Sequence, residues 1–182
     1  MTRTRILAAV GALGAAALVW AAVAIAQDVN CAGGGKQCNG TQFDDQITGS
    51  SKADGINAKG GNDSSYAKKW NDVVEGGAGN DYVEGGPGDD KISGGDDDDQ
   101  YLIGGLFGGP GDDTIEGGDG NDDLYGEKGK DVLSGGPGDD QLDASGFGDN
   151  EKDRLSCGPG NDVAFATSKD KVGNDCEEVI PN

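Results

Sequence analysis

A nine-residue repeat fills most of the chain and constrains its fold more than any other feature. Near-complete units begin at Gly76 and read GGAGNDYVE, GGPGDDKIS and GGDDDDQYL. After an insert the register resumes at Gly108 with GGPGDDTIE, GGDGNDDLY, GEKGKDVLS and GGPGDDQLD. Weaker units start at residues 40, 49, 58, 67, 148 and 157, so we take 40–165 as the repeat region, with inserts at 103–107 and 144–147. A period this short predicts a stack of small coils in place of a globular core.

Two positions of the repeat keep their residue type along the chain. In all thirteen units the sixth residue is aspartate, and in twelve the eighth is Ile, Leu, Val, Tyr or Ala, with Ser65 as the exception. The acidic, glycine-rich composition alone would indicate a disordered chain. A disordered linker, however, has no reason to hold an acid and an apolar residue in fixed phase, so the repeat predicts order.

Each unit divides into a turn, GGxGxD, and a three-residue strand, xUx, where U is the apolar residue. Glycine adopts left-handed dihedrals at little steric cost, which lets the turn bend sharply and aim its carbonyls inward. In the strand the U side chain points to one face and its neighbours to the other. Stacked coils would therefore share a thin core, which is the ladder Val83, Ile92, Ile115, Leu124, Leu133 and Leu142.

The sixth-position aspartates are expected to form columns. If two units make one coil, residues eighteen apart stack about 4.8 Å from each other. Asp81 then lies over Asp99, Asp72 over Asp90, Asp113 over Asp131 and Asp122 over Asp140. Carboxylates so close repel each other unless a divalent cation lies between them. Oxygen-only donors favour Ca²⁺ over Mg²⁺, zinc or copper.

The candidate metal ligands follow from this arrangement. The carboxylates with most support are Asp81, Asp90, Asp113, Asp122, Asp131 and Asp140, then Asp99, and the set also includes Asp63, Asp72 and Asp162. The candidate turn carbonyls are those of Gly76, Gly77, Gly79, Gly85, Gly86, Gly88, Gly108, Gly109, Gly111, Gly117, Gly118, Gly120, Gly135, Gly136 and Gly138. In the degraded units before residue 76, Asp45, Asp54, Asp63 and Asp72 are expected to keep the register and to bind weakly or not at all. Whether Asp99 has a partner beyond the insert stays open.

The pattern GGxGxDxUx resembles the RTX, or hemolysin-type, calcium-binding nonapeptide repeat. The resemblance covers about residues 40–165, and the stretch DRLSCGPGNDVAFATSKDKVGNDCEEV also looks like the cysteine-closed ends of secreted actinobacterial members. It implies an all-β fold, a right-handed parallel β-roll. It also implies calcium ions held between neighbouring turns by sixth-position carboxylates and glycine carbonyls.

Composition excludes several other functions. The chain has no histidine and a formal net charge of −20, so it lacks a Ser-His-Asp or Cys-His nucleophile pair and His-ligated zinc. The negative charge argues against nucleic acid or an anionic membrane as partner. Nearly every pair of acids belongs to a repeat, and no separate cleft-forming domain is evident. We therefore expect no enzyme.

The N-terminal segment predicts export. Arg3 and Arg5 precede an uncharged apolar run that ends in Ala24-Ile25-Ala26, the pattern of a signal peptide over 1–26 that is cleaved after Ala26. The alternative is an uncleaved membrane anchor, because the run is long enough to span a bilayer. Without Arg3 and Arg5, 12 basic residues face 34 acidic ones, so the exported chain would carry −22.

Four cysteines flank the repeats in an oxidising compartment. Cys31 and Cys38 lie in an expected N-terminal cap over 27–39, Cys157 in the last unit, and Cys176 in an expected C-terminal cap over 166–182. Three pairings are possible, of which the local one would close short loops at both ends.

The sequence therefore predicts a secreted calcium-binding protein that folds on binding Ca²⁺. The alternative is a structural or adhesive extracellular module that presents a surface to a wall, matrix or carbohydrate, with calcium only as scaffolding. The partners expected are calcium ions, and an extracellular surface or carbohydrate remains open.

Overall fold

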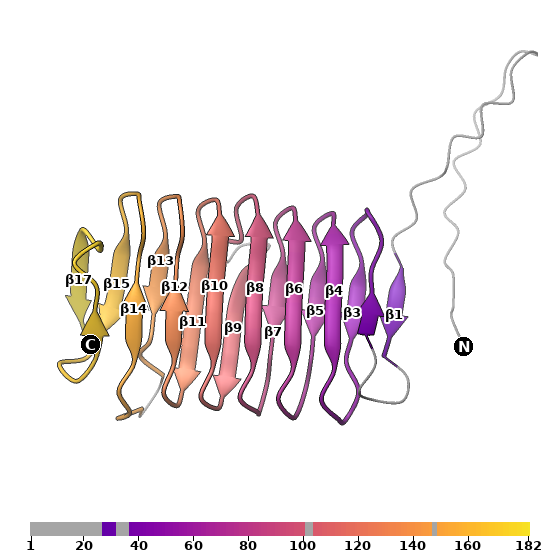
Figure 1. Ribbon diagram of the computed structural model, residues 1–182, viewed down its shortest axis with the longest axis horizontal. Helices are drawn as coiled ribbons and strands as arrows, with labels where there is room; N and C mark the ends of the chain where they lie inside the picture. Colours follow the sequence, from indigo (N-terminus) through magenta and orange to yellow (C-terminus); the bar gives the residue numbers. More distant parts are fainter. Residues whose placement is uncertain (1–26, 32–36, 101–103, 147–148) are drawn as a thin grey trace, which may run out of the picture.

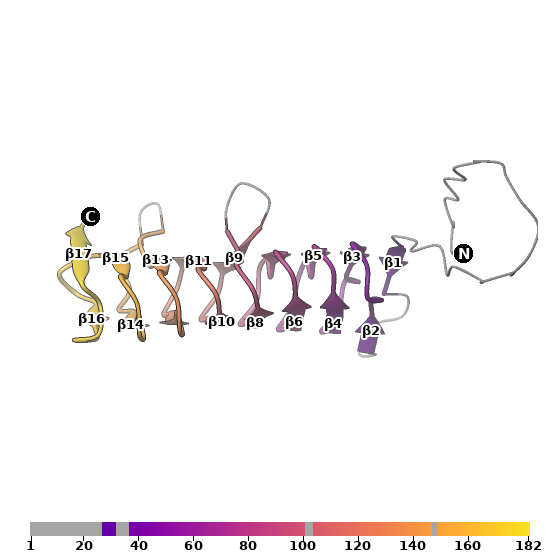
Figure 2. The same ribbon diagram turned by 90° about the horizontal axis from the view of Figure 1, so that it is seen from above.

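The computed structural model describes residues 27–31, 37–100, 104–146 and 149–182 as a β-solenoid in which short strands alternate between two parallel sheets. Figures 1 and 2 show the sheets as two layers that run the length of the molecule. The predicted all-β parallel roll is confirmed, and the described residues contain no helix. The strands are β1 Asp28–Asn30, β2 Gln37–Asn39, β3 Gln46–Thr48, β4 Gly55–Gly60, β5 Ser64–Tyr66, β6 Val73–Ala78, β7 Tyr82–Glu84, β8 Lys91–Asp96, β9 Gly105–Pro110, β10 Thr114–Asp119, β11 Asp123–Lys128, β12 Val132–Ser134, β13 Gln141–Asp143, β14 Arg154–Ser156, β15 Val163–Ala166, β16 Lys171–Val172 and β17 Glu178–Pro181.

Strands two apart in the sequence pair in parallel. The odd-numbered strands form a nine-stranded sheet and the even-numbered strands an eight-stranded one, each in sequence order. In the regular part the partners are eighteen residues apart, as in Ile56 with Val74 and Thr114 with Val132. One coil therefore consists of two nonapeptides, as the repeat predicts.

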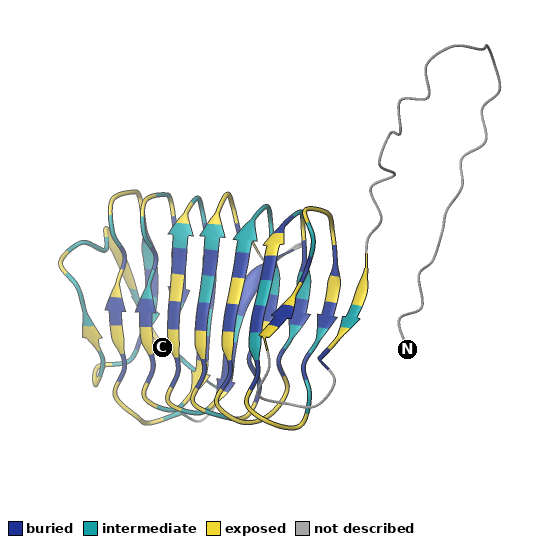
Figure 3. Ribbon diagram, turned by 45° about the vertical axis from the view of Figure 1, so that its right-hand side comes forward, coloured by how far each residue is buried: buried dark blue, intermediate teal, exposed yellow. Residues whose placement is uncertain are grey.

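The core is a single ladder of U residues along each sheet. Burial alternates with exposure along most strands (Figure 3), as in β4 and β10, because successive side chains point to opposite faces. The six U residues predicted to form the ladder are at most 1% exposed, and Ile47, Ile56, Val74 and Leu106 join them. Ser65 takes its predicted U position between Ile47 and Val83, where its hydroxyl is buried without a hydrogen-bond partner among the described residues.

The first insert lies elsewhere than its predicted position at 103–107. Leu106 pairs with Val83 and with Leu124, so the extra five residues fall at 100–104, between Asp99 and the strand. The N–H of Gly85 donates to the carbonyl of Phe107. The xUx segment 105–107 must therefore end directly before Gly108, the glycine that opens the next turn. Counting forward from the preceding turn misses this requirement and places Tyr101 at U.

The second insert is also shifted. The N–H of Ala144 donates to the carbonyl of Phe165, as a first-position residue does. The extra residues therefore lengthen the turn after Ala144, and the insert starts later than the predicted boundary of 144.

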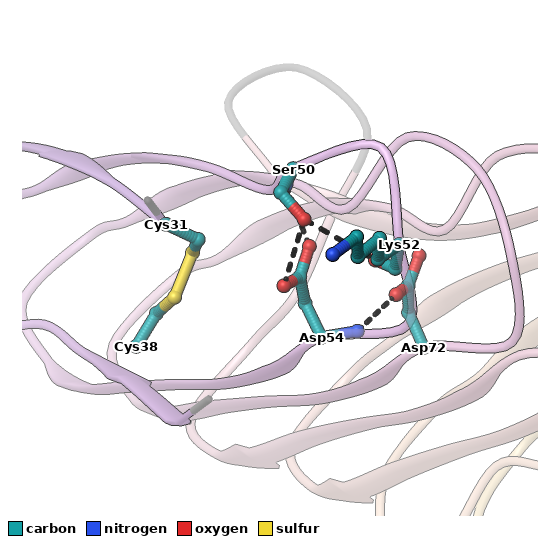
Figure 4. The surroundings of a disulfide bond; sticks show 6 residues. All are labelled: Cys31, Cys38, Ser50, Lys52, Asp54 and Asp72. Atoms are coloured by element: carbon teal, nitrogen blue, oxygen red, sulfur yellow. Dashed lines mark hydrogen bonds between the residues drawn. A yellow bond between two sulfur atoms is a disulfide. The ribbon is translucent and has the colours of Figure 1, made fainter. Parts of the chain in front are cut away.

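Both ends of the roll continue the coil into the segments expected to be caps. β1 and β2 pair with β3 and β4, and β16 and β17 pair with β14 and β15. Disulfides join Cys31 to Cys38 and Cys157 to Cys176, which is the local pairing. Figure 4 shows the first of them at the N-terminal end of the coil.

The segment interpreted as a signal peptide, 1–26, lies outside the described residues. The described part of the chain contains no helix that is long and apolar enough to cross a membrane.

Candidate metal centre

The sixth-position aspartates line two buried columns, one at the start of each sheet's strands. Each of these carboxylates is at most 4% exposed. Within a column the backbone N–H of one aspartate donates to Oδ1 of the next. The four stacked pairs predicted from the sequence are joined in this way, at 2.6 Å for Asp81–Asp99, 2.8 Å for Asp72–Asp90, and 2.9 Å for Asp113–Asp131 and Asp122–Asp140.

The columns run past the first insert without a break. The N–H of Asp90 donates to Oδ1 of Asp113 at 2.7 Å, and that of Asp99 to Oδ1 of Asp122 at 2.9 Å. These partners are 23 residues apart rather than eighteen, which is the length of a regular coil plus the five-residue insert. Asp99 therefore has a partner on both sides, which the sequence left open.

The second carboxylate oxygen of most column aspartates is buried and unsatisfied. Among the described residues Oδ2 has no hydrogen-bond partner at Asp63, Asp72, Asp81, Asp90, Asp99, Asp113, Asp122, Asp131, Asp140 and Asp162. These are the ten aspartates that the sequence predicts as metal ligands. A buried polar atom without a partner costs free energy, so ten in regular array require a common explanation.

The first glycine of each turn leaves the space that Oδ2 occupies. A Cβ built on Gly76 would lie 2.5 Å from Oδ2 of Asp81, and one on Gly85 would lie 2.5 Å from Oδ2 of Asp90. The carboxylate therefore folds back into its own turn, where a larger first residue would displace it.

The second and fourth glycines bring turn carbonyls close to the next coil. Gly77, Gly79, Gly86, Gly88, Gly109, Gly111, Gly118, Gly120, Gly136 and Gly138 all have positive φ. A Cβ on Gly109 would lie 2.6 Å from the carbonyl oxygen of Gly86, and one on Gly79 2.5 Å from that of Gly61. Carbonyl oxygens of successive turns therefore stack beside the carboxylate columns.

Burial shifts the titration of the column carboxylates. Desolvation is the largest cause, and repulsion between neighbouring acids adds to it at most of them, while the hydrogen bond from the preceding N–H opposes both. The pKa is raised to about 8 at Asp99 and Asp113, to about 7 at Asp63, Asp72, Asp131 and Asp140, and to about 6 at Asp81, Asp90, Asp122 and Asp153. Burial also raises the pKa of Asp162. Burial therefore disfavours the charged form of these carboxylates when nothing compensates the charge. Protonation would relieve this cost, and so would a bound cation.

The donor set fits a hard divalent cation. It consists of carboxylate oxygens and stacked main-chain carbonyls, the ligands that Ca²⁺ takes in flexible geometry. The chain has no histidine, and its cysteines are paired in disulfides, so soft-metal ligands are missing. In the described residues no three His, Cys, Asp or Glu side chains gather around one point, so side chains alone would not complete a site and main-chain carbonyls would have to supply the remaining oxygens.

Two acids that the sequence analysis missed extend the columns. The N–H of Asp153 donates to Oδ1 of Asp170 at 3.1 Å, and the N–H of Asp162 donates to Oε2 of Glu177 at 3.0 Å. The glycine signature is lost after residue 165, which hides these turns. The surviving signal is the pattern acid-x-apolar, in Asp170-Lys171-Val172 and Glu177-Glu178-Val179.

Comparison with known proteins agrees with this geometry. The RTX calcium-binding nonapeptide repeat, in four copies, matches residues 39–67, 71–101 and 106–146, which together are more than half of the chain. No curated protein matches it. The repeat, the parallel roll and the aspartate columns thus agree, and the chain belongs to the RTX calcium-binding nonapeptide repeat family.

Proposed function

We propose that this is a secreted calcium-binding protein whose repeats fold into the roll when they bind Ca²⁺. The observation that carries the proposal is the set of ten buried, unpartnered Oδ2 atoms in two columns. Calcium would supply positive charge between the acids and a bond partner for these atoms. The ligands would be the ten aspartates and the carbonyls of the adjoining turns.

Net charge explains why folding would depend on the ion. The chain carries −20, and −22 after cleavage at Ala26, so a metal-free roll is opposed by its own repulsion. A divalent ion that bridges two coils cancels two charges and ties the coils together. Because binding and folding then share one free energy, the chain would fold after export, where calcium is plentiful.

We further propose that the chain has no catalytic activity of its own. The buried aspartates are committed to the columns, where Oδ1 binds the backbone of the neighbouring coil. A purified sample that hydrolyses glycosides, peptides or esters, and loses this activity in Asp122→Ala, would overturn this part of the proposal.

Circular dichroism of the secreted protein tests calcium-dependent folding. At pH 7.5 we expect a coil spectrum in EGTA and a β spectrum after calcium is added, with magnesium at equal concentration much less effective. Equal β content in EGTA and in calcium would overturn the proposal.

Secretion has a separate test. Cells expressing the full chain should release a protein whose first residue is Gln27, as determined by N-terminal sequencing. Retention in the membrane fraction with an intact N-terminus would instead support the anchor.

One observation favours the adhesive alternative. Tyr66, Tyr82, Phe107 and Tyr125 form a ladder of rings on successive strands of the nine-stranded sheet, with centroids 5.6, 5.3 and 4.7 Å apart. The rings are half-buried and offer apolar contacts to a polymer such as a carbohydrate. If this function holds, Tyr82→Ala with Tyr125→Ala should reduce retention on cell-wall polysaccharide and leave calcium-dependent folding unchanged.

A further inference from the structure

Thirteen turns of the roll fall into two classes by the conformation of their second residue. Two other described turns belong to neither class: the lengthened turn that ends in Asp153, whose Ser145 donates to Asp143, and the last turn, which ends in Glu177. The second residue has positive φ in ten turns, at Lys59, Lys68, Gly77, Gly86, Gly95, Gly109, Gly118, Glu127, Gly136 and Gly158. Those turns end in the ten aspartates whose Oδ2 has no partner. The conformation in these ten turns therefore does not require glycine, because lysine and glutamate adopt it as well.

Three other turns carry serine or threonine at the second position. Thr41, Ser50 and Thr167 keep φ outside the left-handed region, and each binds the aspartate of its own turn. The N–H of Thr41 donates to Oδ2 of Asp45 at 2.5 Å and its hydroxyl at 2.9 Å. The N–H and hydroxyl of Thr167 donate to Oδ2 of Asp170 at 2.6 and 2.8 Å.

Ser50 does the same for Asp54. Its N–H donates to Oδ2 at 2.6 Å, and its hydroxyl donates to Oδ1 at 3.1 Å. Figure 4 shows the serine above the carboxylate, with the N–H of Asp54 directed to Asp72 of the next coil. In all three turns two donors from one residue satisfy the carboxylate that is left unsatisfied elsewhere.

The three turns lie at the ends of the roll. Asp45 and Asp54 precede β3 and β4, and Asp170 precedes β16. Lysine ammonium groups stand beside two of them. Nζ of Lys59 donates to the carbonyl of Gly40 at 2.8 Å, and Nζ of Lys169 donates to the carbonyl of Asn150 at 2.9 Å. Each ammonium brings a fixed positive charge to a turn carbonyl at an end of the roll.

Position explains the difference in chemistry. An ion between two coils needs donors from both, and a terminal turn has a regular coil on one side only. A carboxylate there must be satisfied within its own turn or stay uncompensated. The hydroxyl and N–H of serine or threonine do this without metal, because both donate to the carboxylate of the same turn.

We propose that the turns 40–45, 49–54 and 166–170 are metal-independent caps, in which serine or threonine replaces the ion, and that calcium binding is confined to the ten interior turns. This rests on the proposed calcium-binding function. It also divides the four degraded N-terminal turns, because Asp63 and Asp72 are assigned to the metal-binding class and Asp45 and Asp54 to the caps.

Equilibrium dialysis with ⁴⁵Ca tests the assignment, with circular dichroism of the same samples as a check of folding. We compare the secreted wild-type protein with a cap pair, Asp45→Ala and Asp54→Ala, and an interior pair, Asp81→Ala and Asp90→Ala. The cap pair should bind as many ions at saturation as the wild type, and the interior pair at least one fewer. An equal loss in both pairs would overturn the caps, whereas a wild type that binds no calcium would overturn the proposed function.

A second variant covers the case in which the cap pair does not fold. Thr41→Gly with Ser50→Gly restores the residue pattern of interior turns and leaves both carboxylates in place. We expect it to fold in calcium, to bind at least as many ions as the wild type, and to need more calcium for half-folding. Fewer bound ions would mean that the hydroxyls are ligands, which would contradict their role as substitutes.

Discussion

At the scale of the single residue, each column aspartate has two separate functions. Oδ1 accepts a hydrogen bond from the neighbouring coil, and Oδ2 is left for a cation. The second function could be predicted from the spacing of the acids, but the first could not, because it depends on which atom faces which backbone N–H. It also accounts for the aspartates of two capped turns, where Oδ2 is already satisfied, because Oδ1 of Asp45 accepts from the N–H of Gln27 and Oδ1 of Asp170 from that of Asp153.

Replacing aspartate by asparagine separates the two functions, because asparagine keeps Oδ1. We predict that Asp122→Asn with Asp140→Asn raises the calcium concentration for half-folding by at least about tenfold. The hydrogen bond at Oδ1 is kept, so the variant loses one charged oxygen ligand and one negative charge at each site, and every 1.4 kcal/mol of binding free energy lost is about tenfold in affinity. The measurement is a calcium titration followed by circular dichroism. Glu116→Gln with Asp119→Asn removes equal charge from exposed positions and serves as control, and equal midpoints for both pairs would contradict the ligand assignment.

Ser65 is the one polar residue at an interior U position. Its hydroxyl is buried without a partner between Ile47 and Val83. Ser65→Val should raise the free energy of unfolding in calcium by about 1–2 kcal/mol, since it removes an unsatisfied group and adds apolar contact. Urea unfolding measures the change. Ser64→Val on the outer face is the control, and lower stability of Ser65→Val would show that the hydroxyl has an unrecognised role.

The raised pKa values predict how the metal-free protein responds to pH. Folding raises the carboxylate pKa from 3.8 to about 6–8, so the folded state holds more protons than the unfolded state in this range. Stability therefore falls as pH rises from about 4 to 8. Protein stripped of metal on a chelating resin should show more β signal at pH 4.5 than at pH 8. A β signal that grows with pH in the absence of metal would be the opposite of this expectation.

At the scale of the element, the sequence predicts most of the roll because turn and strand have separate signatures. The U ladder and the parallel register follow directly from the nine-residue period. The phase across the first insert does not, because only the hydrogen bond from Gly85 to Phe107 shows that the strand must adjoin the following turn. The coils after residue 165 are hidden for another reason: their turns lack the GGxGxD pattern, and only acid-x-apolar remains.

The conformation of the fourth position is not predictable from residue type alone. A left-handed conformation is unfavourable for a residue with a Cβ, yet Trp70 and Asp97 at the fourth position both have positive φ. The stack of neighbouring coils imposes the conformation, which outweighs a local cost of about 1–2 kcal/mol.

Two deletions of equal length test the corrected phase of the insert. Removal of 100–104 restores a nine-residue unit that retains Leu106 at U, so we predict an unchanged calcium midpoint and unchanged thermal stability. Removal of 103–107 takes Leu106 out of the ladder and should lower both stability and calcium response. The measurement is the melting temperature of each deletion variant. A higher melting temperature for the variant without 103–107 would support the original prediction that the insert lies at 103–107.

At the scale of the whole molecule, the apolar core is too thin to explain the fold by itself. Each nonapeptide buries one U side chain, so each ladder gains one such side chain per coil of eighteen residues, and a coil contacts only its neighbours. The ends are closed by disulfides and by the three Ser/Thr turns. Between these turns lie eleven buried aspartates, and carboxylates so close repel one another. Under the proposed function, bound calcium holds the coils together in the middle of the roll, and disulfides and hydrogen bonds hold them together at its ends.

Small-angle X-ray scattering with a thermal melt of the same sample tests this claim most directly. At pH 7.5 the secreted protein in EGTA should be expanded, without a cooperative melting transition. Calcium should lower its radius of gyration and produce a sharp melt, and EGTA should reverse both. A protein that has the same radius of gyration and melting temperature in excess EGTA as in calcium would show that the acid columns are stable without an ion.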